Sequence, residues 1–246
     1  MMINYINHNP FTIFMNHIMI DGIDSSGKGI ATNAAKEFLH KKGLKVLDLR
    51  DHWKDHDDYP NITDYDAIIT TEPTFSSYGK KIRFEMINNK TAHTPKEIAT
   101  AFSKDRKEMY EKVVIPAKKA NKIIVQERGV ISSLVYQPLM EGTDRDFVLN
   151  LEGNQFCLNN SPDLLIITTV DPEESIKRLG TRKKKDDAIF EKQSFLQKCQ
   201  EVYKSDWIKQ IYESNGTKII FLDTNPPKTP EDTKEAIHKI LDKGFN

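Results

Sequence analysis

The chain has 246 residues, and its 36 Lys plus Arg balance 36 Asp plus Glu, so the formal net charge is zero. This balance excludes a global basic field that would recruit nucleic acid or a membrane surface, so any anion site must be local. The two cysteines, Cys157 and Cys199, are far apart and lack metal-ligand spacing. We therefore expect a reducing, cytoplasmic location and no disulfide framework.

The first twenty residues mix apolar positions such as Phe11, Ile13 and Phe14 with polar ones. This pattern predicts neither a signal peptide nor a membrane span. Met15 is an alternative start, and we expect residues 1–14 to be a loose, disordered extension. Residues 15–246 show no internal repeat and no low-complexity linker, so we expect them to form a single domain.

A phosphate-binding loop is predicted directly after the apolar run Ile18–Ile20, where Gly22 and Lys28 have the spacing Gly-x-x-x-x-Gly-Lys. Glycines allow the backbone N–H groups of such a loop to point at phosphate oxygens, and the lysine adds a positive charge. The helix that follows presents its positive N-terminus to the same anion. We therefore expect a nucleotide to be bound by Gly22, Asp24, Ser25, Ser26, Gly27, Lys28, Gly29 and Ile30.

The residue after Lys28 departs from this motif. A Ser or Thr normally follows the lysine, and its hydroxyl binds Mg²⁺, whereas this chain has Gly29. The glycine leaves phosphate binding intact but removes the usual protein ligand of the metal. The alternative is a glycine-rich turn that binds no ligand, and the combination of strand, spacing and lysine disfavours it.

Strand-like and helix-like stretches alternate along the rest of the chain. The first helix closes at Gly43, and apolar runs at 45–49, 67–71, 123–125, 164–170 and 218–223 indicate further strands. The polar stretch 50–65, rich in Asp and His, is interpreted as a solvated loop rather than a metal site. Helices are expected at 80–88, from the capping sequence Thr94–Glu97 to about Pro116, through Leu179, from about Phe190 to Tyr212, and after Thr229.

This alternation predicts a three-layer α/β fold of the P-loop NTPase type, with a mostly parallel, five-stranded sheet and helices on both faces. Ligands of such sheets bind at the carboxyl ends of the strands. Besides the loop, the polar residues expected to converge there are Glu72, Glu127 with Arg128, Asp171 and Asp223.

Several stretches, in the same order, resemble thymidylate kinases. They are 20–28, Thr71–Pro73, Gly79–Arg83, Ala101–Arg106, Glu127–Gln137 and Pro162–Glu173. The similarity extends from about Ile18 to Tyr203, and Glu127–Gln137 is its most specific part. The resemblance implies a P-loop nucleoside-monophosphate kinase that transfers the ATP γ-phosphoryl group to dTMP and uses Mg²⁺ with ATP. It also implies a homodimer that binds neither nucleic acid nor a membrane.

The resemblance further implies roles in an acceptor site. Phe102 would stack on the thymine ring and Arg106 would reach the base edge, while Arg128 would grip the acceptor phosphate and Tyr136 would press against the sugar. The other expected substrate contacts are Asp24, Glu72, Pro73, Ser133 and Gln137. From the residues alone, Phe102 and Tyr136 are also compatible with core packing, and Arg106 with a surface ion pair to Asp105 or Glu108.

The basic run from Arg178 to Lys185 resembles the mobile lid of the family, and we expect a short lid at about residues 178–190. Phosphoryl transfer needs a cation over the γ phosphate, and the phosphate loop itself contains no arginine. Arg182 is the preferred lid arginine, with Arg178 as a further ATP contact. The expected catalytic residues are Lys28, Arg128, Arg182 and Glu127, and the expected metal ligands are Asp24 and Glu127.

Gly29, Glu127 and Gly129 depart from the family pattern. Glu127 stands where Asp is usual, and Gly129 stands where an aromatic residue is usual, which we expect to loosen one wall of the acceptor site. The insertion at 51–64 is longer than expected for the family. The alternatives are a phosphotransferase with another deoxynucleotide acceptor or polyphosphate as donor, and a catalytically inactive nucleotide-binding relative. A GTPase-like switch is disfavoured because no Asn-Lys-x-Asp segment occurs.

Overall fold

The computed structural model describes residues 15–87, 93–140, 142–180 and 193–245. The expected extension 1–14 lies outside these residues, as does most of the expected lid, including Arg182. Within the described parts of the chain, no helix is long and apolar enough to cross a membrane.

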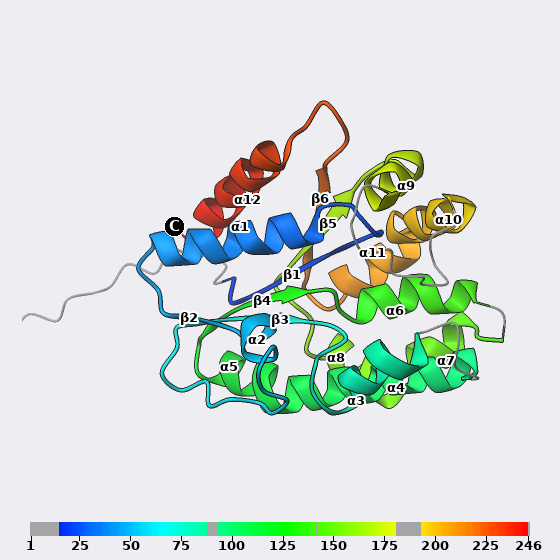
Figure 1. Ribbon diagram of the computed structural model, residues 1–246, viewed down its shortest axis with the longest axis horizontal. Helices are drawn as coiled ribbons and strands as arrows, with labels where there is room; N and C mark the ends of the chain where they lie inside the picture. Colours follow the sequence, from blue (N-terminus) through cyan, green and yellow to red (C-terminus); the bar gives the residue numbers. More distant parts are fainter. Residues whose placement is uncertain (1–14, 88–92, 141, 181–192, 246) are drawn as a thin grey trace, which may run out of the picture.

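One parallel sheet forms the middle layer of the fold (Figure 1). It has six strands rather than the expected five, in the order β2-β3-β4-β1-β5-β6, and every neighbouring pair is parallel. The strands are β1 (His17–Gly22), β2 (Val46–Asp48), β3 (Ala67–Thr71), β4 (Ile123–Glu127), β5 (Leu164–Thr169) and β6 (Lys218–Asp223). The loop that follows β1 therefore opens at the carboxyl edge between β4 and β5, where parallel sheets bind their ligands.

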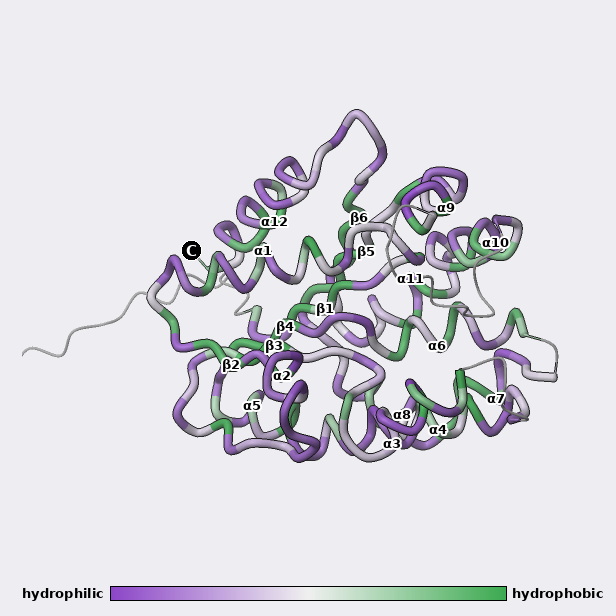
Figure 2. The backbone as a smooth tube through the Cα atoms, viewed as in Figure 1, coloured by the Kyte–Doolittle hydropathy of each residue, from purple (hydrophilic) through white to green (hydrophobic). Residues whose placement is uncertain are grey.

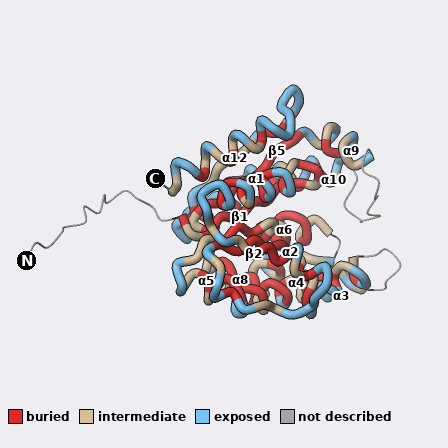
Figure 3. Tube along the Cα trace, turned by 60° about the vertical axis from the view of Figure 1, so that its left-hand side comes forward, coloured by how far each residue is buried: buried red, intermediate tan, exposed pale blue. Residues whose placement is uncertain are grey.

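Both faces of the sheet are buried, as in other parallel sheets. In β1, Met19 packs into one core cluster, while Ile18 and Ile20 pack into a second cluster on the other face. The inner strands are accordingly mostly hydrophobic in Figure 2 and buried in Figure 3, whereas the edge strand β6 is only partly buried. Helices α1 (Lys28–Lys41) and α12 (Pro230–Phe245) contribute to the cluster of Ile18 and Ile20 and cover that face together.

The remaining helices lie mostly over the face of Met19. Side chains of its cluster come from α4 (Pro95–Met109), α5 (Ile115–Lys119), α6 (Val130–Tyr136), α8 (Glu152–Leu158), α10 (Gln193–Tyr203) and α11 (Asp206–Glu213), and two of the short helices named next add Leu49 and Val148. The shorter helices are α2 (Leu49–His52), α3 (Ser77–Lys81), α7 (Arg145–Asn150) and α9 (Pro172–Gly180). The result is the predicted three-layer α/β arrangement, with helices on both faces of the sheet.

Several predicted boundaries differ from the structure. The capping box at Thr94 is confirmed, because the Glu97 N–H donates to Thr94 Oγ1 and the Thr94 N–H donates to the Glu97 carboxylate. The helix does not stop near Pro116, because a π-helical turn (Tyr110–Val114) joins it to α5 and proline is tolerated in the first turn of α5. The helix expected at about 190–212 is two helices, since Ser205 caps a second one at Asp206.

Candidate active site

The loop between β1 and α1 has the geometry of a phosphate-binding loop. Gly22 and Gly27 have φ angles of +146° and +92°, which residues with a Cβ rarely adopt. A Cβ at Gly22 would also lie 2.3 Å from the carbonyl oxygen of Thr168 in β5. At Gly22, both the backbone conformation and the close approach of β5 therefore require glycine.

Lys28, the first residue of α1, is buried, and its side chain folds back over the loop. Its Nζ donates hydrogen bonds to the carbonyl oxygens of Gly22 at 2.9 Å and Ile23 at 2.7 Å. Burial lowers the pKa of Lys28 to about 8, and the charge of Arg128 adds to this effect while neighbouring carboxylates oppose it. An anion placed beside this ammonium would restore its charged form, which suits a phosphate-binding lysine.

Asp21, the residue before Gly22, fixes the loop to the helices above it. Its carboxylate accepts hydrogen bonds from the N–H groups of Gly22 at 2.7 Å and Gly129 at 3.0 Å. It also accepts from Ser132 Oγ at 2.9 Å and from the Tyr203 hydroxyl at 2.8 Å. Tyr203 was not predicted as part of the site, because nothing in its local sequence indicates that α10 returns to the end of β1.

Arg178 of α9 lies beside the loop. It donates to the carbonyl oxygens of Ser25 at 3.3 Å and Thr224 at 2.7 Å, and Glu174 accepts from its Nε at 2.9 Å. Thr224 in turn donates from Oγ1 to the Ser26 carbonyl oxygen at 3.1 Å. Sequence reasoning missed Thr224, whose only signal was its place directly after an expected strand.

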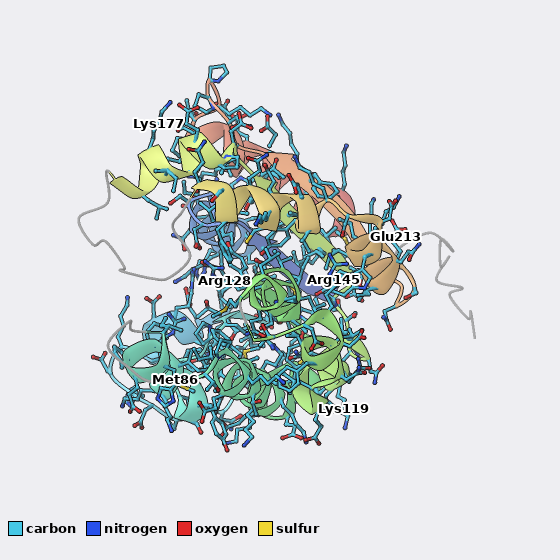
Figure 4. The ribbon with its side chains drawn as sticks, turned by 90° about the vertical axis from the view of Figure 1, so that its right-hand side faces the viewer. Met86, Lys119, Arg128, Arg145, Lys177 and Glu213 are labelled. Carbon is cyan, nitrogen blue, oxygen red and sulfur yellow. The ribbon has the colours of Figure 1, made fainter. Side chains whose placement is uncertain are left out.

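Arg128 connects the end of β4 with the phosphate loop. Its φ angle is +65°, an uncommon value for a residue with a side chain, and its N–H donates to the Ile20 carbonyl oxygen at 2.9 Å. Its guanidinium pairs with Asp24 of the loop. Figure 4 draws Arg128 between Lys177 of α9 and Met86. Such backbone conformations occur preferentially at functional sites.

Glu127 precedes Arg128 and faces the start of α1. Its Oε2 accepts from Arg50 Nη1 at 3.1 Å, and its Oε1 lies 4.0 Å from the position that a Cβ at Gly29 would occupy. Arg50 belongs to α2, which begins at Leu49 and extends into the polar stretch interpreted as a solvated loop. That interpretation is wrong for Arg50, whose side chain is only 20% exposed.

Arg106 is fully buried, so the surface ion pair considered for it is wrong. Its Nε donates to Glu72 at 2.9 Å, its Nη2 donates to Ser133 Oγ at 2.8 Å, and its Nη1 donates to Asn154 of α8. Burial raises the pKa of Glu72 to about 7, against the opposing charge of Arg106. Three predicted residues, Arg106, Glu72 and Ser133, thus form one network, to which the structure adds Asn154.

The other predicted acceptor residues lie nearby. Phe102 is partly buried and packs against a small cluster that includes Ile82 and Ala101. Tyr136 is buried and packs against Phe195 and Tyr203, with ring centroids 6.0 Å and 6.5 Å away. Gln137 is buried, and its Oε1 has no hydrogen-bond partner among the described residues.

Two expectations about this edge need correction. The space that a side chain at Gly129 would enter is filled by Met19, whose Sδ lies 2.5 Å from the ideal Cβ position, so the glycine leaves no opening there. Asp171 and Asp223 were expected to join the loop, but Asp171 is exposed and Asp223 pairs with Lys228 at 2.6 Å.

The carboxylates beside the loop fit a metal that arrives with a nucleotide. Mg²⁺ is commonly held by one or two carboxylates together with substrate phosphates and water. In the described residues no group of three or more His, Cys, Asp or Glu is arranged to hold a metal by itself. Asp24 lies on the loop, and Glu127 Oε1 faces Gly29 with no hydrogen-bond partner in the described parts of the chain.

A parallel sheet with a glycine-rich, lysine-bearing loop after its β1 strand, and with an arginine facing that loop, defines a P-loop nucleotide-binding protein. Residues 61–237 match the sequence profile of a family described as thymidylate kinase. The chain belongs to the thymidylate kinase family.

Individual relatives agree with the profile. A probable thymidylate kinase of Methanococcus aeolicus is 33% identical over 227 residues, which cover 92% of this chain and 96% of the relative. A probable thymidylate kinase of Thermococcus onnurineus is 30% identical over 190 residues, 74% of this chain and 78% of the relative. A thymidylate kinase of Aster yellows witches'-broom phytoplasma is 32% identical over 162 residues, 64% of this chain and 74% of the relative. The first of these alignments is long enough to include the phosphate loop, which lies before the segment matched by the profile.

Proposed function

We propose that this protein transfers the γ-phosphoryl group of ATP to dTMP, giving ADP and dTDP. One observation supports this activity above the others: Arg128, suited to an acceptor phosphate, pairs with Asp24 on the same loop whose Lys28 is suited to the donor. Both cations therefore face one site, as a reaction between two phosphate groups requires. Membership of the thymidylate kinase family fits the same reaction.

On the donor side, we assign the β and γ phosphates to Lys28 and to the backbone N–H groups of the loop from Gly22 to Ile30. Arg178 would contact the nucleotide from the side of Ser25. Arg182 stays a prediction as the lid arginine that neutralises the transferred group.

On the acceptor side, Arg128 would exchange Asp24 for the dTMP phosphate, because its planar fork suits a bidentate phosphate contact. Phe102 would stack on the base and Tyr136 would pack against the sugar. Arg106, which Glu72 and Ser133 hold in place, would contact the edge of the base. Pro73 and Gln137 would line the same site. An oxygen of the acceptor phosphate would then attack the γ phosphorus in line as ADP leaves.

Mg²⁺ would be held by Asp24 and Glu127 together with the ATP phosphates, and it would neutralise charge as the phosphoryl group moves. The family resemblance alone supports two further parts of this proposal, namely homodimer assembly and a cytoplasmic location.

The experiment is release of ADP by the purified protein with MgATP and a panel of acceptors: dTMP, dUMP, dCMP, dAMP, dGMP and UMP. Lys28→Ala removes the donor cation, and Lys42→Ala is the matched control because Lys42 caps the far end of the same helix and pairs with exposed Asp242. We expect turnover on dTMP well above the other acceptors, loss of turnover in Lys28→Ala and wild-type turnover in Lys42→Ala. Turnover with polyphosphate but not with ATP, or nucleotide binding without any turnover, would overturn the proposal.

A further inference from the structure

The edge strand β2 leads directly into the short helix α2, which carries Arg50. Asp48 ends β2 and caps α2, because its carboxylate accepts the Arg50 N–H at 3.0 Å. Leu49 and Trp53 are both buried in the main core cluster and anchor this turn at either end. The core therefore anchors the chain on both sides of Arg50.

The guanidinium of Arg50 joins three elements. Its Nε and Nη2 donate to the two oxygens of Asp48 at 3.0 Å and 2.9 Å, and Nη2 also donates to Asn33 of α1 at 2.9 Å. Its remaining nitrogen, Nη1, donates to Glu127 at 3.1 Å. Lys36 of α1 holds Asp48 from the other side at 2.8 Å. The bidentate contact with Asp48 fixes the plane of the guanidinium group. This orientation points Nη1 toward Glu127.

Glu127 is thereby held next to the residue that lacks the usual hydroxyl. Arg50 occupies Oε2, which leaves Oε1 directed at Gly29, 4.0 Å from the Cβ position there. Fixing a side chain as flexible as glutamate in one orientation costs rotamer entropy, so a contact that already holds it in place improves the precision of the site. Gly29, Glu127 and Arg50 thus form one local unit.

We propose that Arg50 is a positioning residue of the active site, which holds the Glu127 carboxylate beside Gly29 so that Oε1 meets the metal of the bound nucleotide in place of the missing hydroxyl. This inference rests on the proposed function, because it assigns Glu127 to the metal of MgATP. Arg50 acts through Glu127 and makes no contact with the phosphates. Lysine cannot replace it, because one ammonium lacks the fork that spans Asp48 and Glu127.

The test is a double-mutant cycle with Arg50→Met, Glu127→Gln and the double variant. Two quantities are measured for each protein: kcat with MgATP and dTMP, and the ratio of ADP dissociation constants without and with Mg²⁺, by calorimetry in the absence of acceptor. Lys54→Met is the matched control, since Lys54 directly follows Trp53, is 70% exposed and pairs only with Asp51 among the described residues. Arg50→Lys is a second variant that keeps the charge.

We expect Arg50→Met to lower kcat and the Mg²⁺-dependent gain in ADP affinity by about 10- to 100-fold, as for other residues that orient metal-binding groups. In the Glu127→Gln background, Arg50→Met should cause no further loss of either quantity, because the residue acts through that carboxylate. Arg50→Lys should lose most of the Mg²⁺-dependent gain in ADP affinity while keeping a wild-type melting temperature. Lys54→Met should match the wild type in both kcat and this gain.

If the fold losses of kcat and of the Mg²⁺-dependent gain in ADP affinity multiply in the double variant, the proposal is overturned. Independent losses would mean that Arg50 contacts the phosphates directly. An unchanged Mg²⁺-dependent gain in both Arg50 variants would overturn it too. If Arg50→Met does not fold, Arg50→Lys alone and combined with Glu127→Gln completes the cycle. The calorimetric ratio needs no turnover, so failure of dTMP phosphorylation in the wild type would refute the proposed function separately from this inference.

Discussion

Lys28 makes nucleotide binding depend on pH in a direction that the structure fixes. Its ammonium is buried, and its pKa is lowered from 10.5 to about 8, chiefly by burial. Bound phosphates favour the charged form, so the pKa of Lys28 must rise when a nucleotide binds. Protons are therefore taken up on binding at any pH between the two pKa values.

The size of the effect follows from the pKa of about 8 in the free protein. At pH 8 roughly half of the lysines are neutral, so binding takes up about 0.5 proton, against about 0.1 at pH 7 and about 0.9 at pH 9. ADP affinity at pH 9 falls about tenfold, or about 1.4 kcal/mol, below its value at pH 7. The phosphates contribute little at pH 8 and 9, because their last ionisation has a pKa of about 6 and is almost complete there.

The assay is calorimetry of ADP binding at pH 7, 8 and 9 in buffers of different ionisation enthalpy, which yields the number of protons taken up. Lys28→Arg is the control, since an arginine stays charged throughout this range and its variant should take up none. No uptake at pH 8 in the wild type would refute the reasoning, as would an uptake that persists in Lys28→Arg.

Three further predictions concern glycines and the buried arginine. Gly22→Ala should abolish ADP binding and destabilise the protein by clearly more than Gly43→Ala. Gly43 also has a left-handed φ, of +77°, but the space that an added Cβ would occupy there is open. Equal unfolding free energies of the two variants in urea would contradict this prediction. Arg106→Met should cost about 3 to 5 kcal/mol by leaving the charge of Glu72 buried and unpaired. Because the pKa of Glu72 is raised to about 7, that loss should be larger at pH 8 than at pH 6, and the opposite order in unfolding experiments would exclude Glu72 as the cause. The nearest atom to an added Cβ at Gly29 is 4.0 Å away, so Gly29→Ser should keep or slightly raise the melting temperature and kcat. A destabilisation beyond about 1 kcal/mol would show that there is less space around Gly29 than the structure indicates.

Local patterns predicted much of the fold and the place of the glycine-rich loop. The spacing of Gly22 and Lys28 identified the loop, and the capping sequence at Thr94 identified the start of α4, because both depend on residues close together in the chain. The end of that helix was wrong at Pro116, since packing continues the helix through a π-helical turn that no local rule indicates. The strand count was also wrong, because membership of an edge strand depends on its neighbour rather than on its own sequence.

The sequence by itself determined that a phosphate-binding loop follows a buried strand in an α/β fold, and its order of motifs pointed to the family. The tertiary structure alone decided which distant side chains meet that loop. Arg50 reaches Glu127, Tyr203 reaches Asp21, and Asn154 reaches Arg106, through pairs separated by 77, 182 and 48 positions in the chain. Such contacts follow from strand order and helix packing, which bring residues together regardless of their separation, so no local pattern in the sequence records them.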